Sequence, residues 1–442
     1  MKNHPHDIRH AFRKEFSDWR VWRARCVVVA FAALAGLAVV GFTAVSEFAF
    51  AQFFGIYQSW RWSPLIWTPL CTAAIVWLTR RHAAGAGGSG IPQVMAALEP
   101  VTAPDKQGLF VSLRLSAAKV MLTTWGLLAG LSLGREGPSV QVAAGVMLSA
   151  RRWLPERSGV SAHGLLVAGG AAGIAAAFNT PLGGVMFAIE ELSRTPEQRS
   201  SGLLMAAIVL AGLMAVSING NATYFGLIHA TGVDTSLIVP GLAVAMASGL
   251  AGGLFSRLLI ASLSGPPRDA FSRLRARKPV LFAAACGLGV AAIGIYSGGA
   301  VFGSSSDHTR AMLAGGEQAP GMFFFLKFIA TWLTAWSGVP AGIFAPSLAI
   351  GAALGNDIAL LLQYPHASAL IALGMVGFLA AATQAPLTSF IIVMEMVDGH
   401  AMVLSLMACA MVARTVSHVL SPPLYTNLAQ AQLLRLPQTS SP

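Results

Sequence analysis

The sequence predicts an all-α polytopic membrane protein made of many short, tilted and broken transmembrane helices in two inverted halves. Three observations predict this fold class: the composition, the length of the uncharged runs, and an internal repeat of glycine- and proline-containing motifs. Of the 442 residues, 55% are hydrophobic and only 11% are charged, and the mean hydropathy is +0.65. Such a chain carries too little charge to be a soluble domain of this size.

Several apolar runs are longer than one membrane crossing. A spanning helix needs about 20 apolar residues. The runs without Asp, Glu, Lys or Arg include residues 27–45, 160–189, 201–233, 328–356 and 358–394. The longer of these must hold two helices or broken ones, which favours a bundle of irregular helices over a set of full crossings.

The basic residues predict the orientation in the membrane. The net charge of +11 comes largely from short loops between apolar runs, so the positive-inside rule explains it and nucleic acid is not an expected partner. We expect a cytoplasmic leader at 1–25, a transmembrane domain at 26–433 and a cytoplasmic tail at 434–442, in the cell (inner) membrane and in contact with the lipid bilayer. Later cytoplasmic turns are marked by Arg80, Arg81, Arg151, Arg152, Arg157, Arg268, Arg273, Arg275, Arg277 and Lys278, and an outer interface by Trp60, Arg61 and Trp62.

The cysteines and N-terminal histidines predict no metal site and no cofactor. Cys26, Cys71, Cys286 and Cys409 lie in apolar runs without metal-ligand spacing, which is typical of buried packing thiols. A solvated leader explains His4, His6 and His10. We expect neither a cleavable signal peptide nor a soluble regulatory domain after the membrane region.

A charged pair inside an apolar stretch is the strongest functional signal. Arg135 and Glu136 lie within Gly-Arg-Glu-Gly-Pro at 134–138. Charges at membrane depth are costly and persist mainly where they face protein or water and have a function. The glycines leave the backbone accessible, and proline is typical of a helix start, where free N–H groups attract anions. We therefore expect an anion site beside Glu136.

Two blocks of the first half recur in the second. Residues 134–139 match 342–347, and residues 175–182 match 380–387. The paired prolines are 208 positions apart for Pro138 and Pro346 and 205 apart for Pro181 and Pro386. Each second block is followed by an acid, Glu190-Glu191 or Glu395. Repeated, interrupted apolar segments predict a transporter whose ion site is built from broken helices near the midplane. Neutral donors are expected there, because a transported ion must also leave.

Four motifs carry a family resemblance: Gly-Ser-Gly-Ile-Pro at 88–92, Gly-Arg-Glu-Gly-Pro at 134–138, Gly-Ile-Phe-Ala-Pro at 342–346 and Pro-Leu-Tyr at 423–425. In order and spacing they resemble the CLC family of chloride channels and chloride/proton exchangers. The resemblance covers about residues 27–433. It implies a CLC-type inverted repeat with halves at about 26–220 and 235–433, and a homodimer in which each subunit has its own anion pathway.

The resemblance also implies roles for particular residues. The Ser89 and Tyr425 hydroxyls and the N–H groups of Ile343 and Phe344 would hold chloride, together with Arg135 and Gly137. Glu136 would be an external gate that competes with chloride and leaves when protonated. Glu191 would relay protons from the cytoplasm, and Lys119 would be a buried basic residue of the same core.

The chain also departs from the family pattern. Gln93 and Met95 replace two acids that often follow the first motif in bacterial exchangers, although Glu99 is present. Ser89 favours chloride over nitrate, and Ser89 with Tyr425 disfavours the fluoride branch. The resemblance thus implies a secondary active antiporter of chloride and protons.

Two other functions are open at this point. A passive voltage- or pH-gated chloride channel of the same fold is the nearer alternative, and Glu191 disfavours it. An intramembrane hydrolase is the other, because residues 130–134 fit Gly-x-Ser-x-Gly with Ser132 as nucleophile. The candidate bases have no suggestive spacing to Ser132, so we do not expect an enzyme; they are His163, His229, His366, His400 and His418. Glu190 stays ambiguous, and Glu395 with Asp398 is expected at a hydrogen-bonded helix end.

Overall fold

The computed structural model describes residues 19–103, 106–155, 158–193, 201–220, 223–226, 235–266, 269–315 and 322–434. Over these residues the chain forms 18 α-helices and no β-strand. The helices of the first half are α2 (Trp19–Ser59), α3 (Pro64–His82), α4 (Ile91–Leu98), α5 (Leu113–Leu128), α6 (Glu136–Ser149), α7 (Ala162–Phe178), α8 (Pro181–Phe187) and α9 (Ser201–Asn219). Those of the second half are α10 (Ile238–Ser264), α11 (Ala270–Arg277), α12 (Pro279–Tyr296), α13 (Ser306–Leu313), α14 (Phe323–Ser337), α15 (Phe344–Leu361), α16 (Ala367–Thr383), α17 (Pro386–Met396), α18 (Val403–Leu420) and α19 (Leu424–Leu433).

The helices differ greatly in length. Within the described ranges, five regions are long and apolar enough to cross a membrane, and they contain α2, α10, α12, α15 and α18. By contrast, α4 and α13 have 8 residues each and α8 has 7. Helix α2 has 41 residues, about 60 Å at 1.5 Å per residue, so it must tilt strongly within a hydrocarbon core of about 30 Å. It begins at Trp19, inside the segment 1–25 that the sequence assigned to a leader.

Several predictions fall outside the described residues. These include residues 1–18 of the expected leader with their three histidines, Arg157, His229, Arg268 and nearly all of the tail. Among the cysteines, Cys71, Cys286 and Cys409 are buried as expected. Cys26 is exposed on α2, so the prediction of burial is wrong there, because its side chain points to the outer side of that long helix.

The repeated blocks adopt the same local structure in both halves. Asn179 and Gln384 follow α7 and α16 in the left-handed conformation, with φ of 59° and 63°, which is a common way to end a helix. Pro181 and Pro386 then occupy the first position of α8 and α17, where proline needs no hydrogen-bond partner. The sequence match therefore encodes a repeated helix–turn–helix.

The two halves meet at a reciprocal backbone contact. The Gly134 N–H donates to the Gly342 carbonyl at 2.8 Å, and the Gly342 N–H donates to the Gly134 carbonyl at 3.0 Å. A Cβ at Gly342 would lie 2.7 Å from the Gly134 carbonyl oxygen, so this approach requires glycine. Because the two glycines are equivalent in the repeat, the reciprocity indicates an approximate two-fold relation.

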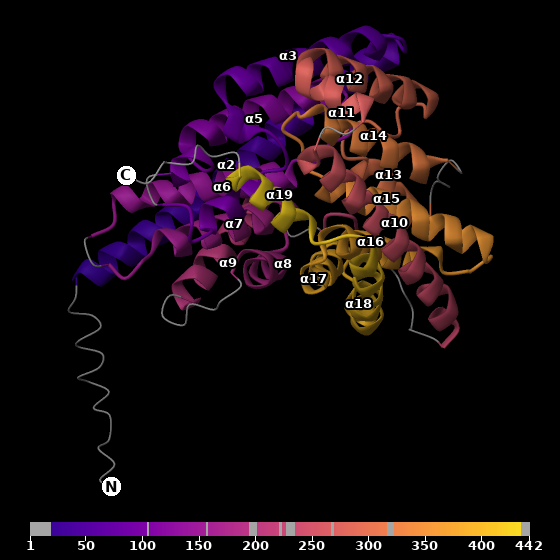
Figure 1. Cartoon of the computed structure of the whole chain (residues 1–442). Coiled ribbons are helices and arrows are strands. Elements are labelled where there is room, and N and C mark those ends of the chain that lie inside the picture. The colour runs from indigo at the N-terminus through magenta and orange to yellow at the C-terminus, as the bar shows by residue number, and fades with distance from the viewer. Residues whose placement is uncertain are drawn as a thin grey trace.

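Figure 1 shows the two halves side by side, the first in indigo to magenta and the second in salmon to yellow. The last helix, α19, returns from the second half and packs against α4 of the first. This return brings residues near the C-terminus next to the loop before α4. The predicted all-α inverted repeat of short and broken helices is confirmed.

Candidate functional site

The loop before α4 holds Ser89 in a fixed position. Gly90 has φ of 106° and precedes the first residue of α4, a conformation that favours glycine. Gln93 binds both sides of the loop: its Oε1 accepts the Gly90 N–H at 2.9 Å, and its Nε2 donates to the Gly87 carbonyl. The Lys119 Nζ donates to the carbonyls of Ala86 at 2.6 Å and Gly88 at 2.7 Å.

Ser89 and Tyr425 face each other although they are far apart in sequence. Ser89 is 9% exposed and Tyr425 1%. Their hydroxyls interact with each other, and neither has a hydrogen bond to another group in the described part of the chain. The Phe344 ring is stacked on Tyr425 with 6.1 Å between centroids. Buried hydroxyls are normally hydrogen-bonded, so this pair is free to bind a further polar species.

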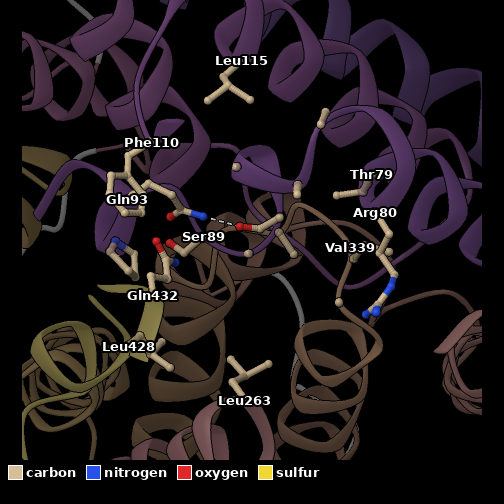
Figure 2. A pocket seen from close by; sticks show the side chains of 18 of the residues that line it. Thr79, Arg80, Ser89, Gln93, Phe110, Leu115, Leu263, Val339, Leu428 and Gln432 are labelled. Carbon is tan, nitrogen blue, oxygen red and sulfur yellow. Dashed lines mark hydrogen bonds between the residues drawn. The ribbon is translucent and has the colours of Figure 1, made fainter. Parts of the chain in front are cut away.

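A cavity of about 820 Å³ reaches this hydroxyl pair. Ser89, Tyr425 and Ile343 line one part of it, and arginine side chains line another; these are Arg80, Arg114 and Arg275. Figure 2 shows Ser89, Gln93 and Gln432 grouped on one side and Arg80 on the opposite side. The cavity is therefore a wide, basic vestibule that ends at neutral donors.

Glu136 is the first residue of α6 and is 1% exposed. Its carboxylate lies close to the backbone N–H groups of Arg135, Glu136 and Ala345, and its Oε2 has no hydrogen-bond partner in the described part of the protein. A Cβ at Gly134 would collide with this oxygen. The glycine thus allows the carboxylate to fold back among the N–H groups at the starts of α6 and α15.

Two other predicted site residues lie beside Glu136. A Cβ at Gly137 would lie 2.5 Å from the Ser89 Oγ, so Gly137 packs directly against Ser89. The Arg135 guanidinium instead binds the Glu47 carboxylate of α2 at 2.8 Å. Neither Gly137 nor Arg135 lines the cavity that contains Ser89 and Tyr425. The structure brings Gly137 to Ser89 and directs the Arg135 charge to Glu47.

Glu190 and Glu395 stabilise each other's helix. The Glu190 carboxylate accepts the N–H groups of Leu387 at 3.1 Å and Thr388 at 2.7 Å, at the start of α17. The Glu395 carboxylate accepts those of Leu182 at 3.2 Å and Gly183 at 2.7 Å, at the start of α8. These acids are equivalent in the repeat, 205 positions apart. Both are reciprocal helix caps.

Glu191 differs from its neighbour. Both acids lie in a π-helical turn, Ala188–Leu192, a local distortion that is frequent at functional sites. Glu191 is half-buried and close enough to Tyr425 for an electrostatic interaction. Glu395 and Asp398 lie near the end of α17 and are both hydrogen-bonded, as expected: Glu395 accepts the N–H groups of α8, and the Asp398 Oδ1 lies 2.7 Å from the His400 Nδ1.

Ser132 contacts a residue that sequence reasoning missed. Its Oγ accepts from the Lys327 Nζ at 2.9 Å and is 2.9 Å from the Thr331 Oγ1. A serine–lysine pair can supply a nucleophile and a base, but Ser132 is 1% exposed and does not line the cavity. The pair is therefore part of the packed core. Lys327 lies 208 positions after Lys119, the same spacing as between Pro138 and Pro346. This spacing could have identified Lys327 as the counterpart of Lys119.

An inverted repeat of broken helices around a buried acid and paired hydroxyls defines a membrane transporter. The family model for voltage gated chloride channels matches residues 71–418. The chain belongs to this family, and the resemblance found in the motifs is confirmed.

Relatives and solved structures agree with this assignment. The proteins named H(+)/Cl(-) exchange transporter ClcA from Citrobacter koseri and Klebsiella pneumoniae are each 31% identical to the chain over 376 residues, covering 81% of this chain and 76% of the relative. A slow cyanobacterial Cl-/H+ antiporter has a TM-score of 0.81 at 24% identity, over 94% of this chain and 99% of that one. A CLC-type fluoride/proton antiporter has a TM-score of 0.75 at 21% identity, over 91% and 96%. These two structures support the fold.

Proposed function

We propose that the protein is a secondary active antiporter that exchanges chloride for protons. The observation that carries this proposal is the position of Glu136, a buried acid among the N–H groups of two helix starts. Such a site stabilises either a carboxylate or a chloride ion. The two anions therefore compete for it, and protonation of Glu136 releases the site to chloride.

We propose the hydroxyl pair as the central chloride site. Ser89 and Tyr425 would donate hydrogen bonds to the ion, and the N–H groups of Ile343 and Phe344 at the start of α15 would supply further donors. Neutral donors bind an anion without holding it too tightly. The basic vestibule carries Arg80 and Arg275, which the positive-inside rule places in the cytoplasm, so it would admit chloride from that side.

Glu191 is the proposed internal proton acceptor. Its electrostatic interaction with Tyr425 supports this role. The relatives named as exchange transporters favour exchange over a passive channel. Glu190 is less suited to this role, because two N–H groups of α17 already engage its carboxylate.

The remaining features of the proposal come from the resemblance and from the basic loops. We propose a homodimer with one pathway per subunit, located in the inner membrane with both termini in the cytoplasm. The transported ions are chloride and protons, no cofactor is required, and no enzymatic activity is proposed. Cross-linking of the reconstituted protein and accessibility labelling of both termini would test the assembly and the orientation.

Reversal potentials distinguish exchange from a passive channel. In planar bilayers with a fixed chloride gradient and a variable pH gradient, an exchanger should reverse at a potential that shifts with the pH gradient. A passive chloride channel would reverse at the chloride equilibrium potential at every pH. The latter result would reject the proposed exchange.

Tyr425→Ala should weaken chloride binding by no more than a few tens of times. The hydroxyl is one neutral donor, and a hydrogen bond of this type contributes about 1 kcal/mol net, while Ser89 and the N–H groups are retained. Isothermal titration calorimetry with chloride measures the change. Unchanged binding would show that Tyr425 does not line the site.

Gln93→Glu should weaken chloride binding several-fold. Glutamate keeps the acceptor for the Gly90 N–H but loses the donor to Gly87, and it adds negative charge beside Ser89. Gln93→Met is the matched control, because it removes both hydrogen bonds without adding charge. Equal binding by the wild type and both variants in the same calorimetric assay would show that Gln93 does not shape the site.

A further inference from the structure

Lys327 is a fully buried cation that the proposed mechanism does not use. It lies on α14 and is 0% exposed. Its Nζ donates to the carbonyls of Val301 at 3.1 Å and Gly303 at 2.7 Å and to the Ser132 Oγ at 2.9 Å. These three acceptors are neutral oxygens. Burying an ammonium group is costly unless its hydrogen bonds are satisfied, and here all three protons have acceptors.

The repeat gives Lys327 a counterpart in the first half. Lys119 is also 0% exposed and lies 208 positions earlier. Its two carbonyl acceptors, Ala86 and Gly88, each lie 215 positions before the two that bind Lys327. Each lysine therefore fastens the loop that precedes a short helix of 8 residues, α4 for Lys119 and α13 for Lys327.

The two lysines differ in what else they hold. Lys119 fixes the carbonyl of Gly88, directly before Ser89. Lys327 reaches Ser132, which lies two residues before Gly134 and four before Glu136. The backbone of Ser132 is also bound by α14, because its N–H donates to the Thr334 Oγ1 at 3.2 Å. The neighbouring Leu131 carbonyl accepts the Gly303 N–H at 3.2 Å.

Residues 131–134, which precede Glu136 and are called the gate loop here, are thus fixed at both ends. Lys327 and Thr334 of α14 hold Ser132, the Gly303 N–H holds Leu131, and the bridge to Gly342 holds Gly134. Only one residue separates Ser132 from Gly134, so a displacement of Ser132 would also displace the backbone at or next to the Gly134–Gly342 hydrogen bonds. Glu136 follows directly, and its carboxylate packs against Gly134.

We propose that Lys327 is a positioning residue for Glu136 and acts through Ser132, while Lys119 positions the Ser89 loop. This inference rests on the proposed role of Glu136 as the gate. It predicts that the two lysines have separate effects. Loss of Lys327 alters the pH dependence of the gate, and loss of Lys119 alters the affinity of the central chloride site.

Three variants test whether the two lysines have these separate effects: Lys327→Met, Ser132→Ala and Lys119→Met. The wild type is first required to exchange chloride for protons in liposomes; failure at that step would reject the proposed function and not this inference. We then measure the pH dependence of chloride flux, the proton-to-chloride ratio and chloride affinity. The charged or titratable groups near Glu136 are Arg135 with its partner Glu47, Tyr224 and Tyr425, and none of the variants changes them.

Lys327→Met should shift the pH midpoint of chloride flux and lower the proton-to-chloride ratio at least twofold, with chloride affinity within twofold of the wild type. Ser132→Ala keeps the buried charge and should shift the midpoint in the same direction, and the double variant should add little to Lys327→Met, since the two residues act as a unit. Lys119→Met should weaken chloride affinity and leave the midpoint unchanged.

Other outcomes overturn the proposal. If Lys327→Met and Ser132→Ala lower only the thermal stability of the detergent-solubilised protein, the pair is purely structural. If Lys327→Met shifts the midpoint and Ser132→Ala does not, the buried charge acts directly and not through the loop. If Lys327→Met does not fold, Ser132→Ala alone decides, because an unchanged midpoint and an unchanged ratio in that variant reject the link to the gate.

Discussion

Glu136→Gln should abolish proton coupling while chloride continues to permeate. The neutral amide resembles the protonated acid, which cannot compete with chloride for the N–H groups of α6 and α15, so the gate is permanently released. Proton movement should fall to the level of protein-free liposomes, and chloride flux should lose its dependence on pH. Both fluxes are measured in the same vesicles with a pH electrode and a chloride electrode.

Glu136→Ala is the matched control for this result. It removes the side chain instead of neutralising it, so any effect of the amide itself would appear as a difference between the two variants. Coupled proton transport that survives in Glu136→Ala would reject the gate assignment.

Glu191→Gln should stop proton transport and leave chloride movement intact. Glutamine has nearly the same shape as glutamate but cannot ionise, and the chloride route through Ser89 and Tyr425 does not need an acid at position 191. Met95 sharpens the test, since it replaces an acid often found nearby in bacterial exchangers and leaves fewer groups able to substitute. Proton and chloride fluxes are compared with those of the wild type at equal protein density.

Glu190→Gln provides the neighbouring control. Its carboxylate caps α17, so the substitution should lower thermal stability and leave coupling nearly unchanged. If Glu190→Gln loses coupling and Glu191→Gln keeps it fully, Glu190 is the internal proton acceptor and the assignment to Glu191 is wrong. Full coupling in both variants would mean that protons take another route.

The sequence predicted the fold class because its signals are local and repeated. The composition predicted the membrane environment, and the paired proline blocks predicted two related halves. In the structure the turns at Asn179 and Gln384 have the same left-handed conformation. The start of α2 was not predicted. The charged and aromatic residues around Arg20 interrupt the apolar pattern, although the helix begins at Trp19.

The site was predictable only where motifs carry it. The proximity of Ser89 to Tyr425 followed from the resemblance, since no periodicity relates residues so far apart in the chain. Reciprocal capping by Glu190 and Glu395 could not be read from sequence, because it depends on how α8 and α17 cross at the interface between halves. The contact of Lys327 with Ser132 was also missed, because it depends on how α14 packs against the loop before α6. The spacing of 208 between Lys119 and Lys327 nevertheless indicated that Lys327 has a counterpart in the first half. The pairing of Arg135 with Glu47 had no sequence signal.

Uphill proton movement tests the central claim most directly. Purified wild-type protein is reconstituted in liposomes loaded with chloride, diluted into low chloride at equal pH on both sides, and the external pH is followed. The account predicts that outward chloride flow drives protons into the vesicles against the proton gradient that builds up, so the external medium becomes alkaline. Chloride efflux with no change in external pH beyond that of protein-free vesicles would contradict it.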